Sequence, residues 1–122
     1  MKVIIDTNGF MIPVQFGVDI FEELKRLGFD KFFVPEAVVF EIEKLIKRER
    51  GSDRTAAKVA RSMMDRCERI IPAVGPADDV ILRLATEMGA AVLTNDIGLK
   101  RRLAEKGIQT ISLRQKNKLD FV

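Results

Sequence analysis

Acidic residues recur at one kind of place in this sequence, the point where a predicted strand gives way to a loop or helix. Asp6 ends the first apolar run, and Asp96 directly follows the fourth. Asp78 begins the helix predicted after the third strand, and Glu41 lies in the first turns of the helix after the second. Because the carboxyl ends of parallel strands meet at one edge of a sheet, we expect these four carboxylates to converge.

Carboxylates that converge repel one another, so such a cluster is costly unless cations neutralise it. Hard oxygen ligands of this kind suit Mg²⁺ or Mn²⁺. Such an ion can activate water and stabilise the charge that develops on a phosphate. The chain has no histidine and a single cysteine, Cys67, which excludes His-based triads and zinc sites built from His or Cys. Acid–base or metal chemistry in this chain must therefore use carboxylates.

Each of these polar residues also has a purely structural interpretation. Asp6 and Asn8 could cap a turn, a place that both residue types favour. Asp78 and Asp96 could be acids at helix N-termini, where the helix dipole stabilises negative charge. Glu41 shares a helix face with core residues and could be the exposed edge of that face. For any one residue the sequence leaves both interpretations open.

The elements that must position these residues alternate along the chain. Strands are predicted at 2–5, 32–34, 69–71, 91–94 and 108–113, and helices at 19–27, 36–50, 52–64, 77–88 and 96–106. The segment 10–16, broken by Pro13, is predicted to be an apolar loop, and 114–122 a basic C-terminal tail with an apolar end. Alternating strands and helices predict an α/β fold with a parallel sheet and right-handed crossovers.

Length and composition set further limits on the class of protein. With 122 residues, 47% of them hydrophobic and 32% charged, the chain is expected to be one globular domain, residues 1–122. A net charge of +3 excludes a polycation but allows a local basic patch for nucleic acid. No apolar run approaches the ~20 residues of a membrane span, so no membrane partner is expected. One cysteine and no signal peptide predict a cytoplasmic protein.

Four segments in order resemble the PIN domain, a compact nuclease domain of VapC-type toxins and of Fcf1-like ribosomal-RNA processing factors. The matching segments are Val3–Asn8, Val34–Ile42, Ala77–Gly89 and Leu93–Asp96. The resemblance implies a three-layer α/β/α sandwich with a central twisted parallel sheet of about four to five strands. It also implies metal-dependent cleavage of RNA. The long apolar stretch at 10–16 favours the processing-factor branch over the toxins.

The resemblance also implies roles for individual residues. The catalytic set is Asp6, Glu41, Asp78 and Asp96, with Asp6, Asp78 and Asp96 as ligands of Mg²⁺ or Mn²⁺. The supporting residues are Asn8, Asp79 and Thr94. The adjacent acids Asp78 and Asp79 leave two candidates for one ligand position. Helical phase favours Asp78, because it continues the apolar stripe through Ile81, whereas Asp79 faces outward.

RNA near an acidic pocket must be held by cations elsewhere. The RNA-binding candidates are Lys47, Arg48, Arg50, Lys100 and Arg101. The alternative is a solvated helix face, because glutamates are interspersed among these cations. Tyrosine and tryptophan are absent and the phenylalanines are predicted to be mostly buried, so we expect no aromatic platform for single bases.

The leading hypothesis is a metal-dependent endoribonuclease, acting in RNA processing or as a toxin-type RNase. The alternative is a catalytically silent RNA-binding or assembly subunit on the same fold. A Rossmann-like nucleotide-binding module would need a Gly-rich loop after the first strand, and a phosphoacceptor receiver domain would carry its acidic pair at that strand. Apolar residues at 10–16 and at Leu119, Phe121 and Val122 suggest an exposed patch for a partner. Besides RNA, that partner could be a second copy forming a homodimer, an antitoxin or a ribosome-assembly factor.

Overall fold

A six-stranded sheet lies at the centre of the protein, as seen in a computed structural model that describes residues 1–122. The strands follow the spatial order β3-β2-β1-β4-β5-β6. The first five are parallel, and β6 pairs antiparallel with β5. The strands are β1 (Lys2–Ile5), β2 (Lys31–Pro35), β3 (Glu68–Ile70), β4 (Ala91–Leu93), β5 (Thr110–Arg114) and β6 (Lys118–Phe121). The predicted α/β fold is confirmed, and the sheet has one strand more than the four to five expected, the antiparallel β6.

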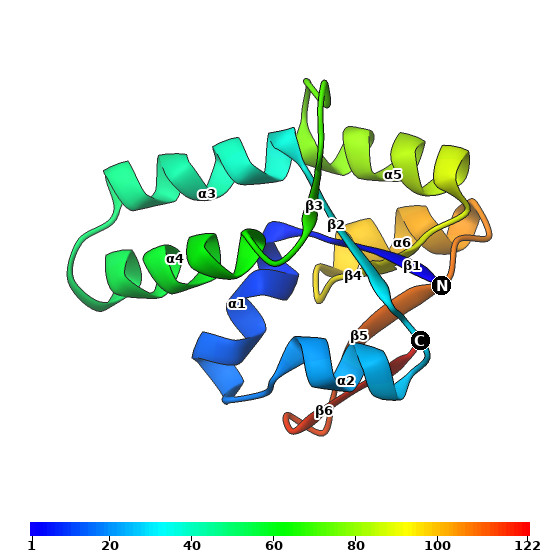
Figure 1. The fold of residues 1–122 in the computed structure, drawn as a ribbon, viewed down its shortest axis with the longest axis horizontal. Coiled ribbons are helices and arrows are strands. Elements are labelled where there is room, and N and C mark those ends of the chain that lie inside the picture. Colours follow the sequence, from blue (N-terminus) through cyan, green and yellow to red (C-terminus); the bar gives the residue numbers. More distant parts are fainter.

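Six helices surround this sheet. They are α1 (Thr7–Phe16), α2 (Ile20–Arg26), α3 (Glu36–Arg48), α4 (Gly51–Met64), α5 (Ala77–Met88) and α6 (Ile97–Glu105). Helices α1 and α2 lie on one side of the strands and α5 on the other, as right-handed crossovers require (Figure 1). The helices α3 and α4 pack side by side and project beyond the end of β1 at which α1 begins (Figure 1). The carboxyl edge of the sheet is therefore bordered by α1, α3 and α5.

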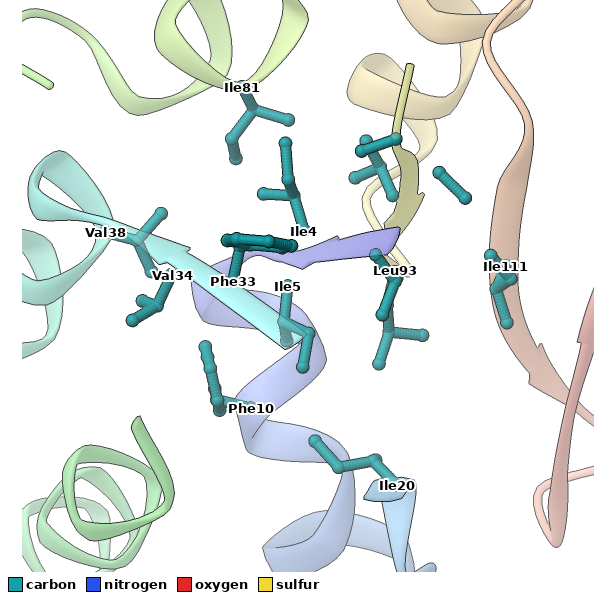
Figure 2. Close-up of a cluster of buried hydrophobic side chains, with 14 of the residues drawn as sticks. Ile4, Ile5, Phe10, Ile20, Phe33, Val34, Val38, Ile81, Leu93 and Ile111 are labelled. Atoms are coloured by element: carbon teal, nitrogen blue, oxygen red, sulfur yellow. The ribbon is translucent and has the colours of Figure 1, made fainter. Parts of the chain in front are cut away.

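The core extends over both faces of the central strand. In β1, Ile4 points toward Ile81 of α5, and Ile5 points to the opposite side, toward Phe10 of α1 (Figure 2). All four side chains are completely buried. A strand buried on both faces needs a continuous apolar run, which is what the sequence of β1 provides. Asp6 follows this run directly and is therefore held at a fixed height on the edge of the sheet.

The predicted apolar loop at 10–16 is wrong, because these residues continue a helix that begins at Thr7. Pro13 lies inside α1, although proline lacks the N–H that would bond to the carbonyl of Gly9. Burial of Phe10 and Ile12 in the core offsets this local penalty. The Asp6 side chain caps the first turn by accepting a hydrogen bond from the Gly9 N–H.

The predicted C-terminal tail is also wrong, because residues 118–121 form the edge strand β6. Its backbone is fixed by two side chains of α2: Arg26 donates to the Leu119 carbonyl at 2.7 Å, and Glu23 accepts from the Leu119 N–H at 3.0 Å. Leu119 is completely buried, as are Phe10 and Ile12. The predicted partner patch is therefore reduced to its outer members, Val14, Phe16, Phe121 and Val122, which are exposed.

No helix of the structure combines the length and the apolar character that a membrane span requires.

Candidate active site

Asp6 stands at the junction between β1 and α1, and the fold buries its carboxylate. Its side chain accepts two short hydrogen bonds, one at Oδ1 from the Gly9 N–H and one at Oδ2 from the Thr94 hydroxyl, both at 2.6 Å. Asp6 is only 6% exposed. Burial raises its pKa to about 7 against the two hydrogen bonds, and the nearby charges of Asp78 and Asp96 raise it further. Asp6 is thus a buried acid that forms no salt bridge with a basic side chain.

Thr94 links Asp6 to Asp96. Strand β4 pairs directly with β1, with Leu93 opposite Ile5, so the residues that follow the two strands meet. The Thr94 hydroxyl donates to Asp6 and accepts from the Asp96 N–H at 3.0 Å. Since both roles of this hydroxyl are taken, its proton is directed to Asp6. Thr94 therefore fixes the orientation of the Asp6 carboxylate.

Asp96 and Asp78 enter the site from two different helices. Asp96 caps α6 and accepts hydrogen bonds from the N–H groups of Gly98 and Leu99. Asp78 lies in the first turn of α5, where no side chain caps the helix. Burial raises the pKa of Asp78, and the charges of Asp96 and Glu41 raise it further. The negative charge of Asp78 is therefore repelled by those of Asp96 and Glu41 across the pocket.

Asp79 is more exposed than Asp78, as helical phase predicted, although it borders the same pocket. Its Oδ1 accepts a hydrogen bond from the Arg102 guanidinium at 2.7 Å, in an ion pair that is largely exposed. Arg102 also lowers the pKa of Asp78, although burial and the acidic neighbours outweigh it. Asp79 thus holds a cation beside Asp78 and is neutralised by it.

These side chains surround one pocket of about 710 Å³ at the carboxyl edge of the sheet. Its polar lining comprises Asp6, Thr7, Asn8, Glu41, Asp78, Asp79, Asp96 and Arg102. All four acids predicted as catalytic are therefore brought together, and five carboxylates face a single basic side chain. The hydroxyl of Thr7 is buried there without a hydrogen-bond partner. Buried polar groups are normally bonded, so this orphan oxygen indicates a place for water or a ligand.

The donor chemistry of the pocket fits a divalent ion, because every candidate ligand is a hard oxygen and negative charge is in excess. No group of three or more acidic side chains is close enough to hold an ion in the present arrangement. The charges of Asp78 and Asp96 raise the pKa of Asp6, and those of Asp96 and Glu41 raise the pKa of Asp78, so a cation among these acids would relieve their repulsion.

The structural interpretation of the acids is correct in part. Asp6 and Asp96 do cap helices, through hydrogen bonds to Gly9 and Gly98. Capping alone does not explain why Asp6 is buried or why Asp78 and Glu41, which cap nothing, face the same pocket. The site therefore combines helix capping with an accumulation of negative charge.

Comparison with known proteins identifies the family. A family model described as a PIN-like domain matches residues 3–116. The chain belongs to the PIN-domain family. This confirms the resemblance found in the four sequence segments, whose acids are those that meet in the pocket.

Two curated PIN-domain relatives are named as ribonucleases. Ribonuclease VapC9 of Archaeoglobus fulgidus is 30% identical over 105 residues, which are 86% of this chain and 77% of the relative. Ribonuclease VapC4 of Methanocaldococcus jannaschii is 28% identical over 120 residues, which are 94% of this chain and 92% of the relative.

Solved structures show the same PIN fold. The PIN domain endonuclease Utp24 superposes with a TM-score of 0.77 at 31% identity, covering 98% of this chain and 90% of that one. A domain of a functionally unknown protein from Methanocaldococcus jannaschii superposes with a TM-score of 0.67 at 20% identity, covering 93% of this chain and 91% of that one. The second likeness concerns the fold alone.

The basic residues predicted to bind RNA lie outside the PIN-domain pocket. Lys47 and Arg48 are exposed in the last turn of α3, and Arg50 precedes α4. Lys100 and Arg101 belong to α6 but do not line the pocket, whereas their neighbour Arg102 does. Contact of the five with RNA remains a prediction.

Three further residues shape the site and were not among the predicted site residues. The Asn95 side chain accepts a hydrogen bond from the Leu113 N–H at 2.9 Å and ties the loop after β4 to β5. Gly9 lets α1 approach β4, since a Cβ there would lie 3.0 Å from the Leu93 carbonyl oxygen. Arg102 lies in a basic stretch of the sequence, and the helical periodicity of that stretch could have shown that Arg102 faces another direction than Lys100 and Arg101. Asn95 and Gly9 lie inside or beside the acidic motifs, where a search for carboxylates passes over them.

Proposed function

We propose that this chain is a metal-dependent endoribonuclease that hydrolyses RNA phosphodiester bonds with Mg²⁺ or Mn²⁺ at the acidic pocket. The main support is the buried Asp6 carboxylate, which shares a pocket with Asp78 and Asp96 while a single arginine offers counter-charge. The names of the relatives, two ribonucleases and one endonuclease, support RNA as the substrate. These relatives are VapC proteins on one side and Utp24 on the other, and their names indicate no common RNA.

In this proposal the ion is held by Asp6, Asp78 and Asp96. When bound, a divalent ion supplies an activated water and neutralises charge on the phosphate. Gly9 and Thr94 each bond one oxygen of Asp6 and so fix the orientation of its carboxylate, as outer-shell partners of metal ligands do.

Other residues of the pocket act on water and on RNA. Glu41 is exposed at the pocket wall formed by α3, where its carboxylate can accept the proton of the attacking water. The unpartnered Thr7 hydroxyl and the exposed Asn8 amide are free to bond water or phosphate oxygens. Arg102 supplies the one positive charge in the lining of the pocket, and Asp79 holds it in place.

A cleavage assay tests this function. An unstructured labelled RNA is incubated with the protein in Mg²⁺, in Mn²⁺ and in a chelator, and its fragments are separated by size. We expect internal fragments with either ion and intact RNA with the chelator. RNA that is bound but remains intact in all three would favour the catalytically silent subunit instead.

A further inference from the structure

A second, smaller cavity of about 320 Å³ adjoins the acidic pocket. It is lined by Ala37, Phe40, Glu41 and Lys44 of α3 and by residues 74–77, which lead into α5. Three of its residues, Glu41, Pro76 and Ala77, also line the acidic pocket, so the two cavities share a wall. Its volume lies at the lower end of the roughly 300–1,000 Å³ that small-ligand pockets occupy. A group bound in it would lie next to a phosphate in the acidic pocket.

The walls of this cavity expose an aromatic ring, contrary to the expectation that no aromatic platform exists. Phe40, which immediately precedes Glu41, is 44% exposed, and Val74 across the cavity is 72% exposed. In α3, Phe40 lies three residues after Ala37 and four before Lys44, which places all three on one face of the helix. The fold leaves nearly half of this side chain uncovered, so part of its apolar surface is open to a ligand.

Two cations flank the ring. Lys44 lines the same cavity, and the Arg69 guanidinium of β3 lies 5.9 Å from the centre of the Phe40 ring. Neither side chain forms a salt bridge, whereas the pocket arginine Arg102 is paired with Asp79. A partly exposed aromatic ring with two unpaired cations nearby is complementary to a nucleobase with its phosphates.

We propose that a subsite formed by Phe40, Lys44, Arg69 and Val74 stacks one nucleobase of single-stranded RNA next to the cleaved phosphate. This inference rests on the proposed function, in which RNA is the substrate. The base lies on the Phe40 ring, and Lys44 and Arg69 hold its backbone phosphates. Stacking on an aromatic face tolerates every base, so the subsite favours unpaired over duplex RNA and not one sequence over another.

The absence of tryptophan and tyrosine from the chain makes the ring testable by fluorescence. Phe40→Trp introduces the only tryptophan, and Phe16→Trp does so at a phenylalanine of similar exposure, 39%, on α1. Each variant is titrated in chelator with a short single-stranded RNA and with an abasic strand of equal length. We expect the base-containing strand to change the emission of Phe40→Trp, the abasic strand to change it much less, and Phe16→Trp to respond to neither.

Affinity measurements test the same ring in a second way. Phe40→Ala should weaken binding of single-stranded RNA by about 5- to 150-fold, and Phe40→Leu by nearly as much, since leucine keeps the apolar surface without an aromatic face. Phe40→Tyr should retain affinity, and Phe16→Ala should bind as the wild type does. Because Phe40 is exposed, thermal melting should show all four variants folded.

Equal emission changes with base-containing and abasic strands would overturn the subsite, as would wild-type affinity in Phe40→Ala. Loss of an oligomer or of a protein partner in Phe40→Ala, with RNA affinity unchanged, would instead assign the ring to a protein interface. Both experiments are done in chelator and measure binding only. A base-dependent signal from a protein that cleaves nothing would therefore contradict the proposed function and leave the subsite standing.

Discussion

Asp6 both caps a helix and lines the acidic pocket, two roles that usually belong to different residues. Its Oδ1 caps α1 through the Gly9 N–H, and its Oδ2 is bonded to Thr94 at the wall of the acidic pocket. The cap makes the orientation of the carboxylate a consequence of helix formation. Its burial makes ionisation costly, so the apo protein holds a carboxyl that is half protonated near neutral pH.

This raised pKa predicts a pH dependence of stability. Between about pH 4 and 7 the folded protein keeps a proton on Asp6 that the unfolded chain has lost. The free energy of unfolding should therefore fall as pH rises through this window and level off above it, by about 4 kcal/mol in all if Asp6 acts alone. Urea unfolding in chelator, from pH 4 to 8, measures this slope. The chain has no histidine, which would otherwise titrate in the same range.

Asp6→Asn is the control for that slope. The amide cannot ionise but can still accept from Gly9 and donate to Thr94, so the variant should be at least as stable as the wild type at pH 8. A wild type whose stability is constant from pH 4 to 7, or an Asp6→Asn variant with the same slope, would show that Asp6 is not the group responsible.

The adjacent acids Asp78 and Asp79 predict unequal effects on activity. Asp78 is half-buried among like charges, whereas Asp79 is exposed and already paired with Arg102. Asp78→Asn should therefore nearly abolish cleavage, and Asp79→Asn should lower it about 10- to 100-fold or less, as loss of a supporting residue does. Rates are compared at saturating Mn²⁺ with folding checked by thermal melting. Normal cleavage by Asp78→Asn and none by Asp79→Asn would reverse the assignment.

At the scale of elements, the close contact of α1 with β4 positions the site. Gly9 makes this approach possible, because a Cβ would lie 3.0 Å from both the Leu93 carbonyl oxygen and Ile5 Cγ2. Neither atom can move cheaply, since one is backbone of the sheet and the other is a packed core side chain.

Gly9→Ala should therefore cost roughly 1–3 kcal/mol of stability, as overpacking does, and should lower activity by displacing the cap of Asp6. Gly98→Ala is the matched control, because a Cβ there meets nothing closer than Asp96 Oδ1 at 3.4 Å. That variant should be neutral or slightly stabilised, since alanine favours helix. Denaturant unfolding compares the two. A Gly9→Ala protein as stable as the wild type would mean that α1 can shift without cost.

The sequence predicted those elements whose signal is local. The apolar runs of β1 and β4 and the helical stripe of α5 needed no knowledge of their partners. Helix α1 was missed because Pro13 gives a strong local signal, which burial in the core overrides. Strand β6 was missed because its backbone is fixed by Glu23 and Arg26, about ninety positions away.

In the site, too, local features could be predicted and long-range contacts could not. The four acids could be predicted because each follows a recognisable strand. Their link through Thr94 could be inferred only by resemblance, because it joins residues 88 positions apart through the pairing of β1 with β4. The exposure of Phe40 could not be predicted, because periodicity assigns a helix face but does not show whether another element covers it.

Across the whole molecule, charge is unevenly distributed. The acidic pocket lies in a chain of net charge +3, so the cations are concentrated elsewhere, including Lys47, Arg48 and Arg50 at the tip formed by α3 and α4. An acidic site repels RNA at short range, so cations outside it would be needed to hold the RNA backbone.

Reversing these three cations to glutamate should weaken binding to unrelated RNAs alike. It should also reduce the slope of log affinity against log salt by roughly 2, since single strands lose about 0.7 of a counterion per phosphate contact. Lys2, Lys31 and Lys106, exposed at the amino edge of the sheet, provide a control with the same change in net charge. Equal losses in both triple variants would indicate a general charge effect and no binding surface at the α3–α4 tip.

A circular RNA distinguishes whether the acidic pocket cleaves RNA internally with a divalent ion. A circle has no ends, so only an endonuclease can linearise it, and the product migrates differently on a gel. The wild type should produce linear RNA in Mn²⁺ and none in chelator, and a folded Asp6→Asn variant should produce none in either. Linearisation by Asp6→Asn at the wild-type rate, or circles that stay closed with the wild type at saturating Mn²⁺, would contradict the account.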